Sequence, residues 1–452
     1  MVDKNEQNNP QRRLDVLHTS LQTGSAAQVR HLLTDLHPAE IADLIESLPH
    51  GPRELIWELV NKDQHGDILL EVNEEVRAGL IDEMEIEQLI SATENLNTDD
   101  LADLVYNLPS TVIHELLHSM DKQNRDRLEA VLSFPEDTAG GLMDLEIVTV
   151  RQNVTLDVVL RYLHLRGNLP VQTDSLIVVD RHDHLQGLLP LATLLTRNPE
   201  LAVSEVMDTM IEGIPSDMQD VDVARLFQDR NLISAPVIDD QGKLIGRITI
   251  DDIVDVIRDE ADHSLMSMAG LDEDSDIFSP VITSAGRRAL WLGLNLATAF
   301  LASWVIGLFE GTLEKVVALA VLMPIVASMG GIAGSQTLTI MIRGLALGQV
   351  GSANARSLLR KEILVSLMNG LIWSLVVAAV TIVWFQQVEI GLIIGAALIL
   401  NLLCAAIAGF SIPLLLKRAG IDPALAGSVL LTTITDVVGF LAFLGMGTIF
   451  LT

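Results

Sequence analysis

The stretch VVALAVLMPIVASMGGIAGSQTLTIMI, residues 316–342, contains 27 residues and no charged side chain. At a rise of 1.5 Å per residue, a helix of this length crosses the roughly 30 Å hydrocarbon core of a bilayer. The stretch therefore predicts a membrane-spanning helix. Four more apolar stretches bounded by isolated charges predict further spans: residues 289–309, 363–388, 390–416 and 423–452.

Charge divides the chain into two parts. Residues 1–286 contain 54 Asp and Glu against 20 Lys and Arg, whereas residues 287–452 contain 6 against 9. The fold class we expect is therefore a multidomain membrane protein, in which a large acidic body precedes five transmembrane helices. A polyanion of this size repels itself unless cations or basic partners neutralise it. The composition thus favours cation chemistry.

Basic residues between the spans predict the orientation. Eight of the nine in residues 287–452 lie before the first span, between the second and third, or between the fourth and fifth. By the positive-inside rule, the N-terminus is cytoplasmic and the C-terminus is external or periplasmic. Residues 1–20 show no signal-peptide pattern, which agrees with this orientation. The one cysteine, Cys404, lies within the fourth span, which excludes an intrachain disulfide and a Cys-rich metal site.

Residues 1–131 predict a cytoplasmic domain of short amphipathic helices. HPAEIADLIESLP at 37–49 recurs as NTDDLADLVYNLP at 97–109. Similarity of helical units at a fixed period indicates a stacked, superhelical α-helical array. Asp99, Asp100 and Asp103 lie at the start of the second copy, where carboxylates stabilise a helix N-terminus. Capping explains Asp99 and Asp100 as well as cation binding does, and Asp103 shares a helix face with Asp99.

Residues 132–258 contain a second duplication, with an offset of 59 residues. VVDRHDHLQG at 178–187 aligns with VIDDQGKLIG at 237–246. Each copy reads as strand, helix, strand, tight turn, strand and helix, with Gly or Asp at the turn. The segment resembles a tandem pair of CBS domains, which are α/β units.

CBS domains bind the ribose and phosphates of adenine nucleotides through a Gly-x-x-Thr/Ser-x-x-Asp motif. The second copy keeps this motif as Gly246, Thr249 and Asp252, whereas the first copy lacks both polar groups. The resemblance therefore implies one site per chain for ATP or a related nucleotide. The alternative is that Thr249 and Asp251 only cap the helix that follows.

An acidic helix should lead toward the first span, in a linker region at residues 259–286. Asp252, Asp255 and Asp259 recur at spacings of three and four residues and share one helix face. Like charges one turn apart destabilise a helix by roughly 0.2–0.5 kcal/mol per pair, and the anionic inner leaflet opposes them further. Bound divalent cations would relieve this repulsion. The other interpretation is a solvated acidic face.

Asp436 is the one acidic residue that the apolar pattern places deep inside a span. A charge there costs roughly 2.5–3.5 kcal/mol, and no Lys or Arg lies deep in another span to pair with it. Its neighbours Thr432, Thr433 and Thr435 carry hydroxyls suited to a polar path. The second span adds Pro324, Gly330, Gly331, Gly334, Ser335 and Gln336, as expected where helices approach closely or where backbone carbonyls face a watery path. Oxygen ligands without His or Cys suit a partly hydrated Mg²⁺ rather than zinc or copper.

The order of helical array, CBS pair, acidic linker and five spans resembles the MgtE family of magnesium channels or transporters over nearly the whole chain. FPEDTAGGLM at 134–143 is similar to the family's lead-in to the CBS pair, and the run from Asp422 to Val437 is similar to its pore helix. The resemblance implies a homodimer whose second and fifth spans surround a pore on the two-fold axis. It also implies that cytoplasmic Mg²⁺ binds between the acidic domains and closes the pore.

The resemblance assigns metal sites to eight residues of this sequence. Three expected acids of the second CBS copy are replaced by Gln219, Val221 and Asn231, and Ile332 stands where the family often has Asn. The pore assignment is kept, whereas the number of regulatory sites is open. The residues are Asp67, Asp99, Asp103, Asp252, Asp255 and Glu260 as regulatory ligands, Asp422 at the cytoplasmic mouth, and Asp436 in the pore.

These patterns predict a plasma-membrane channel or transporter for Mg²⁺ uptake, with a lipid bilayer, Mg²⁺ and an adenine nucleotide as partners and no nucleic acid. Residues 287–452 form its pore domain. Two alternatives are a transporter for Co²⁺ or Mn²⁺ and a membrane-anchored nucleotide sensor. An anchor has no use for a buried carboxylate, which argues against the sensor. Enzyme activity is not expected, because the sequence contains no Ser/His/Asp set, P-loop or HExxH motif.

Overall fold

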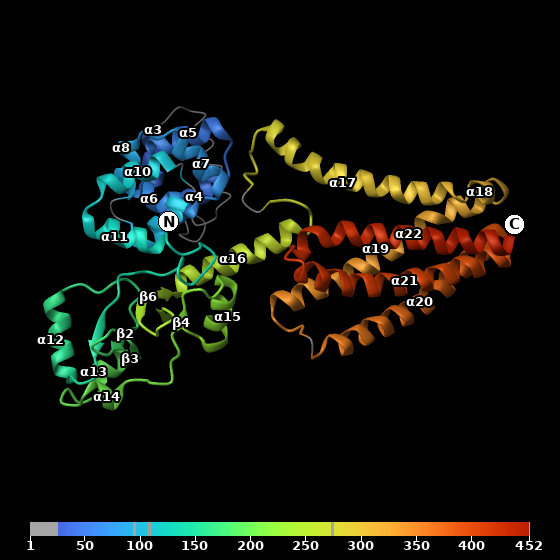
Figure 1. Ribbon diagram of the computed structural model, residues 1–452. Helices are drawn as coiled ribbons and strands as arrows, with labels where there is room; N and C mark the ends of the chain where they lie inside the picture. The colour runs from blue at the N-terminus through green and yellow to red at the C-terminus, as the bar shows by residue number, and fades with distance from the viewer. Residues whose placement is uncertain are drawn as a thin grey trace, which may run out of the picture. The chain divides into compact units, whose positions relative to one another are not determined.

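The computed structural model describes residues 26–93, 96–106, 108, 110–272, 275–351 and 353–451. These residues form two compact units (Figure 1). The first unit contains the described residues up to 261 together with 275–279, and the second contains 262–272 and 280–451. The first therefore holds most of the acidic sequence, and the second holds all five apolar stretches.

The first unit begins with short helices packed around one apolar core. Helices α4 (Pro38–Glu46) and α9 (Thr98–Tyr106) have the same length and bury the same four positions, which confirms the sixty-residue repeat. His37 and Glu40 form a capping box at the start of α4. The other elements are α3 (Ala26–Thr34), α5 (His50–Leu59), η1 (Lys62–Gln64), α6 (His65–Glu71), α7 (Glu74–Asp82), α8 (Ile86–Thr93), α10 (Ser110–Ser119) and α11 (Lys122–Val131).

The second duplication has the predicted order of elements in both copies. Each copy has a three-stranded sheet, β1-β2-β3 or β4-β5-β6, with one parallel and one antiparallel pair. The hairpin turn uses Asp183 in the first copy and Gly242 in the second, at φ of 64° and 78°. Gly, and less often Asp, adopts this left-handed conformation at low cost. The elements are β1 (Thr149–Arg151), α12 (Leu156–Arg166), β2 (Ser175–Val179), β3 (Leu185–Pro190), α13 (Leu191–Thr196), α14 (Val203–Val206), β4 (Ile214–Pro215), α15 (Asp220–Arg230), β5 (Ser234–Ile238), β6 (Leu244–Thr249) and α16 (Ile250–Ser267).

The segment leading into each copy pairs with the other copy. Asp144 forms a β-bridge with Arg247 of β6, and Asp208 forms one with Leu188 of β3. The Arg247 guanidinium also donates to the Asp144 carboxylate at 3.1 Å, and both side chains are buried. The bridges join residues far apart in the sequence, so a pattern in one dimension cannot show this exchange. The exchange ties the two copies into one body.

A buried ion pair fastens the segment after α16 to the N-terminal helices. Arg53 donates from Nη1 and Nη2 to the two carboxylate oxygens of Asp276, at 2.8 and 3.1 Å. Arg53 also donates to the carbonyl groups of Ile45 and Leu48, and the Asp276 backbone N–H donates to Glu75. A buried pair of charges is tolerated when its polar atoms are bonded in this way. The segment that precedes the first span is thereby anchored within the first unit.

Among the described residues of the second unit, five helices are long and apolar enough to cross a membrane, as predicted (Figure 1). Helix α21 is the most buried of them and packs against α19, α20 and α22. Helices α17 and α20 expose most of their apolar side chains, as lipid-facing helices do. The bounds are α17 (Val281–Gly307), α19 (Val317–Ala346), α20 (Ala355–Phe385), α21 (Val388–Arg418) and α22 (Pro423–Leu451), with the short α18 (Glu310–Lys315) joining α17 to α19.

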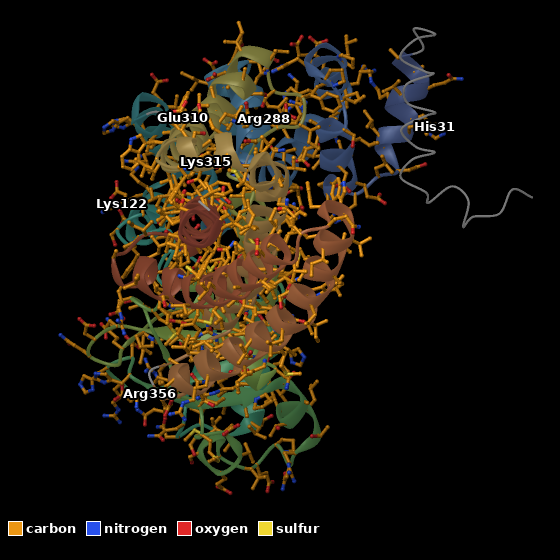
Figure 2. All side chains as sticks on the ribbon, turned by 90° about the vertical axis from the view of Figure 1, so that its right-hand side faces the viewer. His31, Lys122, Arg288, Glu310, Lys315 and Arg356 are labelled. Atoms are coloured by element: carbon orange, nitrogen blue, oxygen red, sulfur yellow. The ribbon has the colours of Figure 1, made fainter. Side chains whose placement is uncertain are left out.

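Charged residues of this unit gather near the helix ends. Glu310 and Lys315 are the first and last residues of α18, whereas Arg288 and Arg356 lie in the early turns of α17 and α20 (Figure 2). Arg343 lies in the last turn of α19. Glu310 lies in the connection between α17 and α19. The arginines lie near the start of α17 or next to the connection between α19 and α20. The acidic and the basic connections therefore alternate along the chain. This is the distribution on which the predicted orientation rests.

We expect Arg53→Ala to destabilise the protein by about 3–5 kcal/mol, because it leaves the Asp276 carboxylate buried without its partner. Thermal unfolding of the purified full-length protein measures the loss. The matched control is Arg161→Ala, since the Arg161–Asp157 pair is exposed and should contribute at most about 1 kcal/mol. Equal effects of the two substitutions would contradict a structural role for the Arg53–Asp276 pair.

Candidate functional site

One face of the second unit is hollowed between α19 and α22, and we name this hollow the α19/α22 groove. It has a volume of about 880 Å³, and Asp436 lies in its wall. Its polar lining side chains are unusual for apolar spans, because lipid cannot satisfy them. The lining consists of Ala327, Ser328, Gly331, Ile332, Ser335, Gln336, Thr339 and Ile340 of α19 with Thr432 and Asp436 of α22.

Asp436 is half-buried near the middle of α22. Within the described part of the chain, its carboxylate makes no hydrogen bond or ion pair. An unpaired carboxylate inside a span is costly and marks a functional site.

The three threonines near Asp436 have different surroundings. Thr432 lines the groove, while Thr435 is fully buried against other helices. Their hydroxyls, and that of Thr433, donate to carbonyl groups of α22 itself. The predicted polar path is thus supported for Thr432 and does not extend to Thr435. The oxygen of Thr432 still has a lone pair for a ligand.

Glycines of α19 explain how the groove is shaped. A Cβ on Gly334 would come within 2.8 Å of Leu431 of α22, and a Cβ on Gly330 would collide with Asn401. These two residues allow the close helix approach that the sequence predicts. Gly331, in contrast, lines the groove and has no heavy atom within 4 Å of a built Cβ. It keeps the groove open.

Asn401 of α21 is a buried amide that sequence reasoning missed. Its Nδ2 donates to the carbonyl of Val326 in α19 at 2.9 Å, and a Cβ on Gly439 of α22 would lie 2.7 Å from that nitrogen. Its Oδ1 has no hydrogen-bond partner in the described structure. Asn401 therefore contacts both groove helices, through a hydrogen bond to α19 and close packing against α22. The sequence signal was a lone Asn in the middle of an apolar stretch.

Glu362 corrects the expectation that Asp436 is the only acid deep in the membrane domain. Glu362 lies in the third turn of α20 and is buried, and it accepts a hydrogen bond from Thr337 of α19 at 3.3 Å. The expected span began at residue 363, because Arg360 and Lys361 precede it. The helix extends beyond the apolar stretch, and Glu362 is buried in the bundle while Arg360 and Lys361 are exposed.

Asp422, expected at the cytoplasmic mouth, caps the start of α22. Its two carboxylate oxygens accept from the backbone N–H groups of Ala424 and Leu425, at 2.9 and 3.1 Å. Oδ2 also lies 3.4 Å from Nε2 of His263, near the end of α16. Met268, just after α16, packs against the apolar cluster formed by α19, α21 and α22. The end of α16 therefore contacts the first turn of the helix that carries Asp436.

A second concentration of carboxylates lies in the first unit, and we name it the acidic cluster. Burial and the neighbouring Asp100 raise the pKa of Asp103 to about 7, and burial and Asp251 raise the pKa of Asp100 to about 6. Arg77 opposes the shift at Asp103. The pKa of Asp255 is also raised, by partial burial and by Asp259. The members that act on one another are Asp67, Asp100, Asp103, Glu136, Asp251 and Asp255.

The acidic cluster contains three of the expected regulatory ligands, Asp67, Asp103 and Asp255. The side chain of Asp99 lies outside the described residues, although its backbone is part of α9. Asp252 and Glu260 lie on α16 beside Asp255 in sequence. The sequence left both capping and cation binding open for Asp100, and the Asn97 backbone N–H donates to its carboxylate. Its position beside Asp251 could not be read from a single helix.

The nucleotide motif is engaged in local contacts. The Thr249 hydroxyl donates to Asp251, and the Thr249 backbone N–H approaches Asp252 Oδ2 at 3.3 Å. Gly246 accommodates Met143, whose sulfur would lie 2.7 Å from a Cβ there. These contacts match the capping alternative. A hydroxyl and two carboxylates at the start of a helix also provide the donors and acceptors that a ribose requires.

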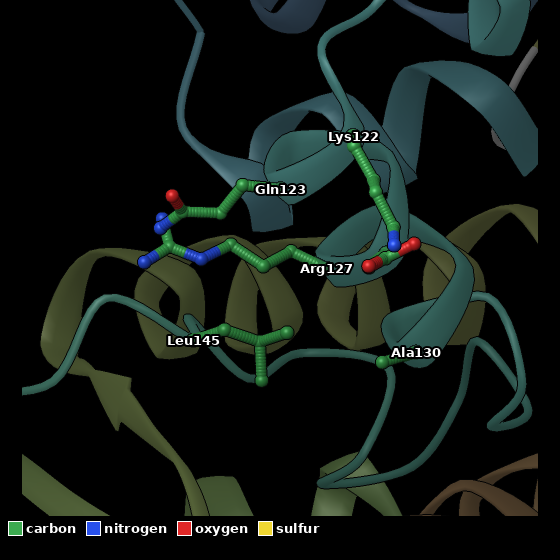
Figure 3. A pocket seen from close by; sticks show the side chains of 6 residues that line it. Lys122, Gln123, Arg127, Ala130 and Leu145 are labelled. Carbon is green, nitrogen blue, oxygen red and sulfur yellow. The ribbon is translucent and has the colours of Figure 1, made fainter.

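A smaller hollow lies beside α11 in the first unit (Figure 3). Its volume is about 460 Å³, and Lys122, Gln123 and Arg127 extend around it with Leu145 opposite. Two basic side chains and one acid, Asp126, do not suit a divalent cation. This hollow is therefore not a candidate metal site.

Three family models match parts of this chain. The MgtE intracellular N domain matches residues 36–137, the CBS domain matches 203–259, and the model for MgtE, a divalent cation transporter, matches 323–446. The CBS match covers only the second copy. The first copy is identified by its equal order of strands and helices.

Curated relatives extend the similarity over nearly the whole chain. The magnesium transporter MgtE of Thermus thermophilus is 30% identical over 444 residues, covering 96% of this chain and 98% of the relative. The magnesium transporter MgtE of Bacillus subtilis is 27% identical over 431 residues, covering 95% and 96%. A solved structure, the cytosolic domain of the Mg²⁺ channel MgtE in complex with ATP, aligns with 54% of this chain and 99% of its own at 30% identity and a TM-score of 0.49.

The acidic cluster predicts that the protein without Mg²⁺ loses stability as pH rises. The folded pKa values of Asp103 and Asp100, about 7 and about 6, exceed the ordinary value of 3.8, so the folded state binds more protons between these limits. Stability should therefore fall between about pH 4 and pH 7 by a few kcal/mol, at about 1.4 kcal/mol per pKa unit. Thermal unfolding in a chelator across this range measures it. Asp103→Asn should make stability depend less on pH in this range. The control Asp229→Asn changes an exposed residue and should leave the dependence as it is. Stability that rises with pH between about 4 and 7 would contradict the prediction.

Proposed function

This chain belongs to the MgtE family of magnesium transporters, and from that premise we propose that it is a Mg²⁺-selective channel or transporter for Mg²⁺ uptake. The observation that carries the proposal is the unpaired Asp436 carboxylate in the α19/α22 groove. Uptake needs no covalent step, because a membrane potential of 100 mV favours entry of a divalent cation by about 4.6 kcal/mol. The proposed activity is transport and not catalysis.

The lining of the α19/α22 groove suits a hydrated Mg²⁺. Mg²⁺ prefers oxygen ligands, dehydrates reluctantly and is usually held by one or two carboxylates with several waters. Asp436 supplies one carboxylate, and Ser335, Gln336 and Thr432 supply neutral polar groups for the water shell. The lining contains no His or Cys, which argues against selection of softer metals.

We further propose that the protein works as a homodimer. Ser328, Ser335, Gln336 and Thr339 are exposed on α19 at positions inside an apolar span. Lipid cannot satisfy these groups, so another protein surface or water must cover them. A second copy related by a two-fold axis would bring two Asp436 carboxylates together. A divalent cation between them would relieve their repulsion.

The proposed location is the plasma membrane, crossed five times, with the N-terminus in the cytoplasm and the C-terminus outside. The multi-pass character follows from the family and from the five apolar helices. The orientation is supported by the basic residues at alternate connections of the helix bundle. It places Asp422 and the end of α16 at the cytoplasmic side.

Cytoplasmic Mg²⁺ is proposed to close the channel by binding at the acidic cluster. Among the described residues, no three carboxylate oxygens of the cluster lie within 4.8 Å of one another, so Mg²⁺ would be held there partly through water. Such a cation stabilises only the arrangement in which the acids face one another. By linkage, it shifts the gating equilibrium through that difference in affinity.

The path from this cluster to the pore runs along α16. Asp252, Asp255 and Glu260 lie on α16, and the same helix ends beside Asp422 through His263. Neutralising its acids with cations would stabilise the helix and hold its end at the pore mouth. This route supports closure at high internal Mg²⁺.

An adenine nucleotide, ATP in the first instance, is proposed to bind at Gly246, Thr249 and Asp252. The support is the intact motif at the start of α16, present in one copy of the duplication only. The nucleotide phosphates would lie near a helix N-terminus, which favours anions. A bound nucleotide would share α16 with the acidic cluster and would bias gating.

A transporter of the same architecture for Co²⁺ or Mn²⁺ is the second candidate. Carboxylate and hydroxyl ligands accept Mn²⁺ as well as Mg²⁺, so geometry alone does not separate them. Uptake of Mg²⁺, Co²⁺, Mn²⁺ and Ca²⁺ into liposomes containing the purified protein decides between them. Preference for Mg²⁺ is the expected result.

Asp436→Ala and Asp436→Asn should each remove most Mg²⁺ uptake or its selectivity, because no other groove residue carries a charge. The loss should be at least about tenfold, since one lost charge-assisted contact is worth about 1.4 kcal/mol or more. Uptake into liposomes at matched protein content measures it. Glu389→Gln, at the start of α21, is the control and should leave uptake unchanged. Selective uptake by the Asp436 variants would refute the assignment.

Neutralising Asp252, Asp255 and Glu260 together should give a channel that stays open at high internal Mg²⁺. The substitutions remove charges whose repulsion Mg²⁺ is proposed to relieve, so Mg²⁺ no longer favours the closed state. Patch recording or flux with internal Mg²⁺ raised stepwise measures the closure. The control neutralises three exposed acids elsewhere, Glu200, Asp229 and Asp240. Normal closure in the first variant would show that α16 does not sense Mg²⁺.

A further inference from the structure

The hairpin turn of the first CBS copy gathers one carboxylate and two imidazoles, apart from the groove and the acidic cluster. Asp180, His182 and His184 each offer a ligand atom, and these atoms lie within 4.8 Å of one another. Asp180 Oδ2 and His184 Nδ1 are 3.2 Å apart. Among the residues that the structure describes, no other three His, Cys, Asp or Glu side chains come this close.

The second CBS copy builds the same turn without imidazoles. There, Asp239 Oδ1 accepts from the backbone N–H groups of Gln241 and Lys243, both at 2.9 Å. Asp180 Oδ1 accepts from the two corresponding residues of the first copy, at 2.8 and 2.9 Å. The turn therefore requires one aspartate oxygen and no histidine. Asp180 Oδ2 pairs with the His184 ring, and the turn requires neither this contact nor His182.

These three side chains are accessible and correctly charged for a metal. His182 is exposed, and Asp180 and His184 are partly exposed. An aspartate carboxylate is ionised at neutral pH, so Asp180 supplies the negative charge that a cation needs. Tetrahedral Zn²⁺ with bonds of 2.0–2.2 Å needs ligand atoms roughly 3.3 Å apart. The three ligand atoms lie within 4.8 Å of one another, so binding requires side-chain rotations that bring them closer.

We propose that this turn is a binding site for a divalent transition metal of the Zn²⁺ type, with Asp180, His182 and His184 as ligands and water completing the shell. Two imidazole nitrogens and one carboxylate are a typical set for Zn²⁺. Mg²⁺ prefers oxygen ligands throughout and does not compete at this site. The chain thus has a site for a class of cation that its all-oxygen sites do not select.

The site lies where the two CBS copies meet. His184 forms a β-bridge with Lys243, and Leu244 N–H donates to the Asp183 carbonyl at 2.9 Å. Leu185 N–H donates in turn to the Gly242 carbonyl at 3.3 Å. A metal that orders the first turn therefore also orders its contact with the second. Zn²⁺ binding should therefore order the hairpin turns of both copies.

Calorimetric titration of Zn²⁺ into the full-length protein, in excess Mg²⁺ to occupy the carboxylate sites, tests the proposal. The main variant is His182→Gln with His184→Lys, which copies the turn residues that the second copy already uses. It should keep the unfolding temperature of the parent and weaken Zn²⁺ binding by about 100-fold or more, since even loss of an outer-shell partner costs 10–100-fold.

A second variant, Asp180→Asn, keeps the Oδ1 acceptor for the turn and replaces Oδ2, the oxygen that faces the His184 ring, by an amide nitrogen. It should weaken Zn²⁺ binding as well. Asp239→Asn, the matched change in the second copy, should leave Zn²⁺ binding unaltered. One Zn²⁺ per chain lost in both first-copy variants supports the site. Equal Zn²⁺ binding by the parent and the His182/His184 variant, or no high-affinity Zn²⁺ in the parent, overturns it.

Discussion

The energetic cost of a carboxylate at membrane depth is the constraint on which the second unit depends. An acid at the centre of a span costs roughly 2.5–3.5 kcal/mol, and Asp436 makes no intrachain bond among the described residues to offset it. Helix α19 therefore presents serine, glutamine and threonine to the same groove. Behind that groove, Asn401 bonds to α19 and packs against Gly439 of α22. This close packing behind α19 and α22 keeps their polar faces next to each other in the groove.

The same physical problem recurs in the first unit, where acids are crowded without enough basic partners. The pKa values of Asp103 and Asp100 are raised to about 7 and about 6, which means that their charged forms are destabilised in the folded protein. Arg77 opposes this shift at Asp103. A bound divalent cation would remove this destabilisation more effectively than protonation at neutral pH. Both units thus contain incompletely neutralised carboxylates. These are Asp436 in the proposed pore and the acidic cluster in the proposed sensor.

The sequence predicted those features that appear in it as repeats or as regular patterns of hydrophobic residues. The helical repeat, the order of strands in the CBS pair and the five apolar helices follow from spacing and hydrophobicity, and the structure has them. Features made by single long-range contacts were missed. The Arg53–Asp276 pair joins residues 223 positions apart, and Glu362 of α20 accepts a hydrogen bond from Thr337 of α19. Asn401 looked like an isolated polar residue because its partner is a backbone carbonyl, which every residue has.

Helix α16 is the element in which these two electrostatic problems meet. Its first half begins at the nucleotide motif and carries Asp251 and Asp255 of the acidic cluster. Its last turns bring His263 to the carboxylate that caps α22. An α-helix transmits displacement along its axis without much bending, and 18 residues span about 27 Å. This continuity gives the proposed coupling a single physical element, whose position cation binding and nucleotide binding would both bias.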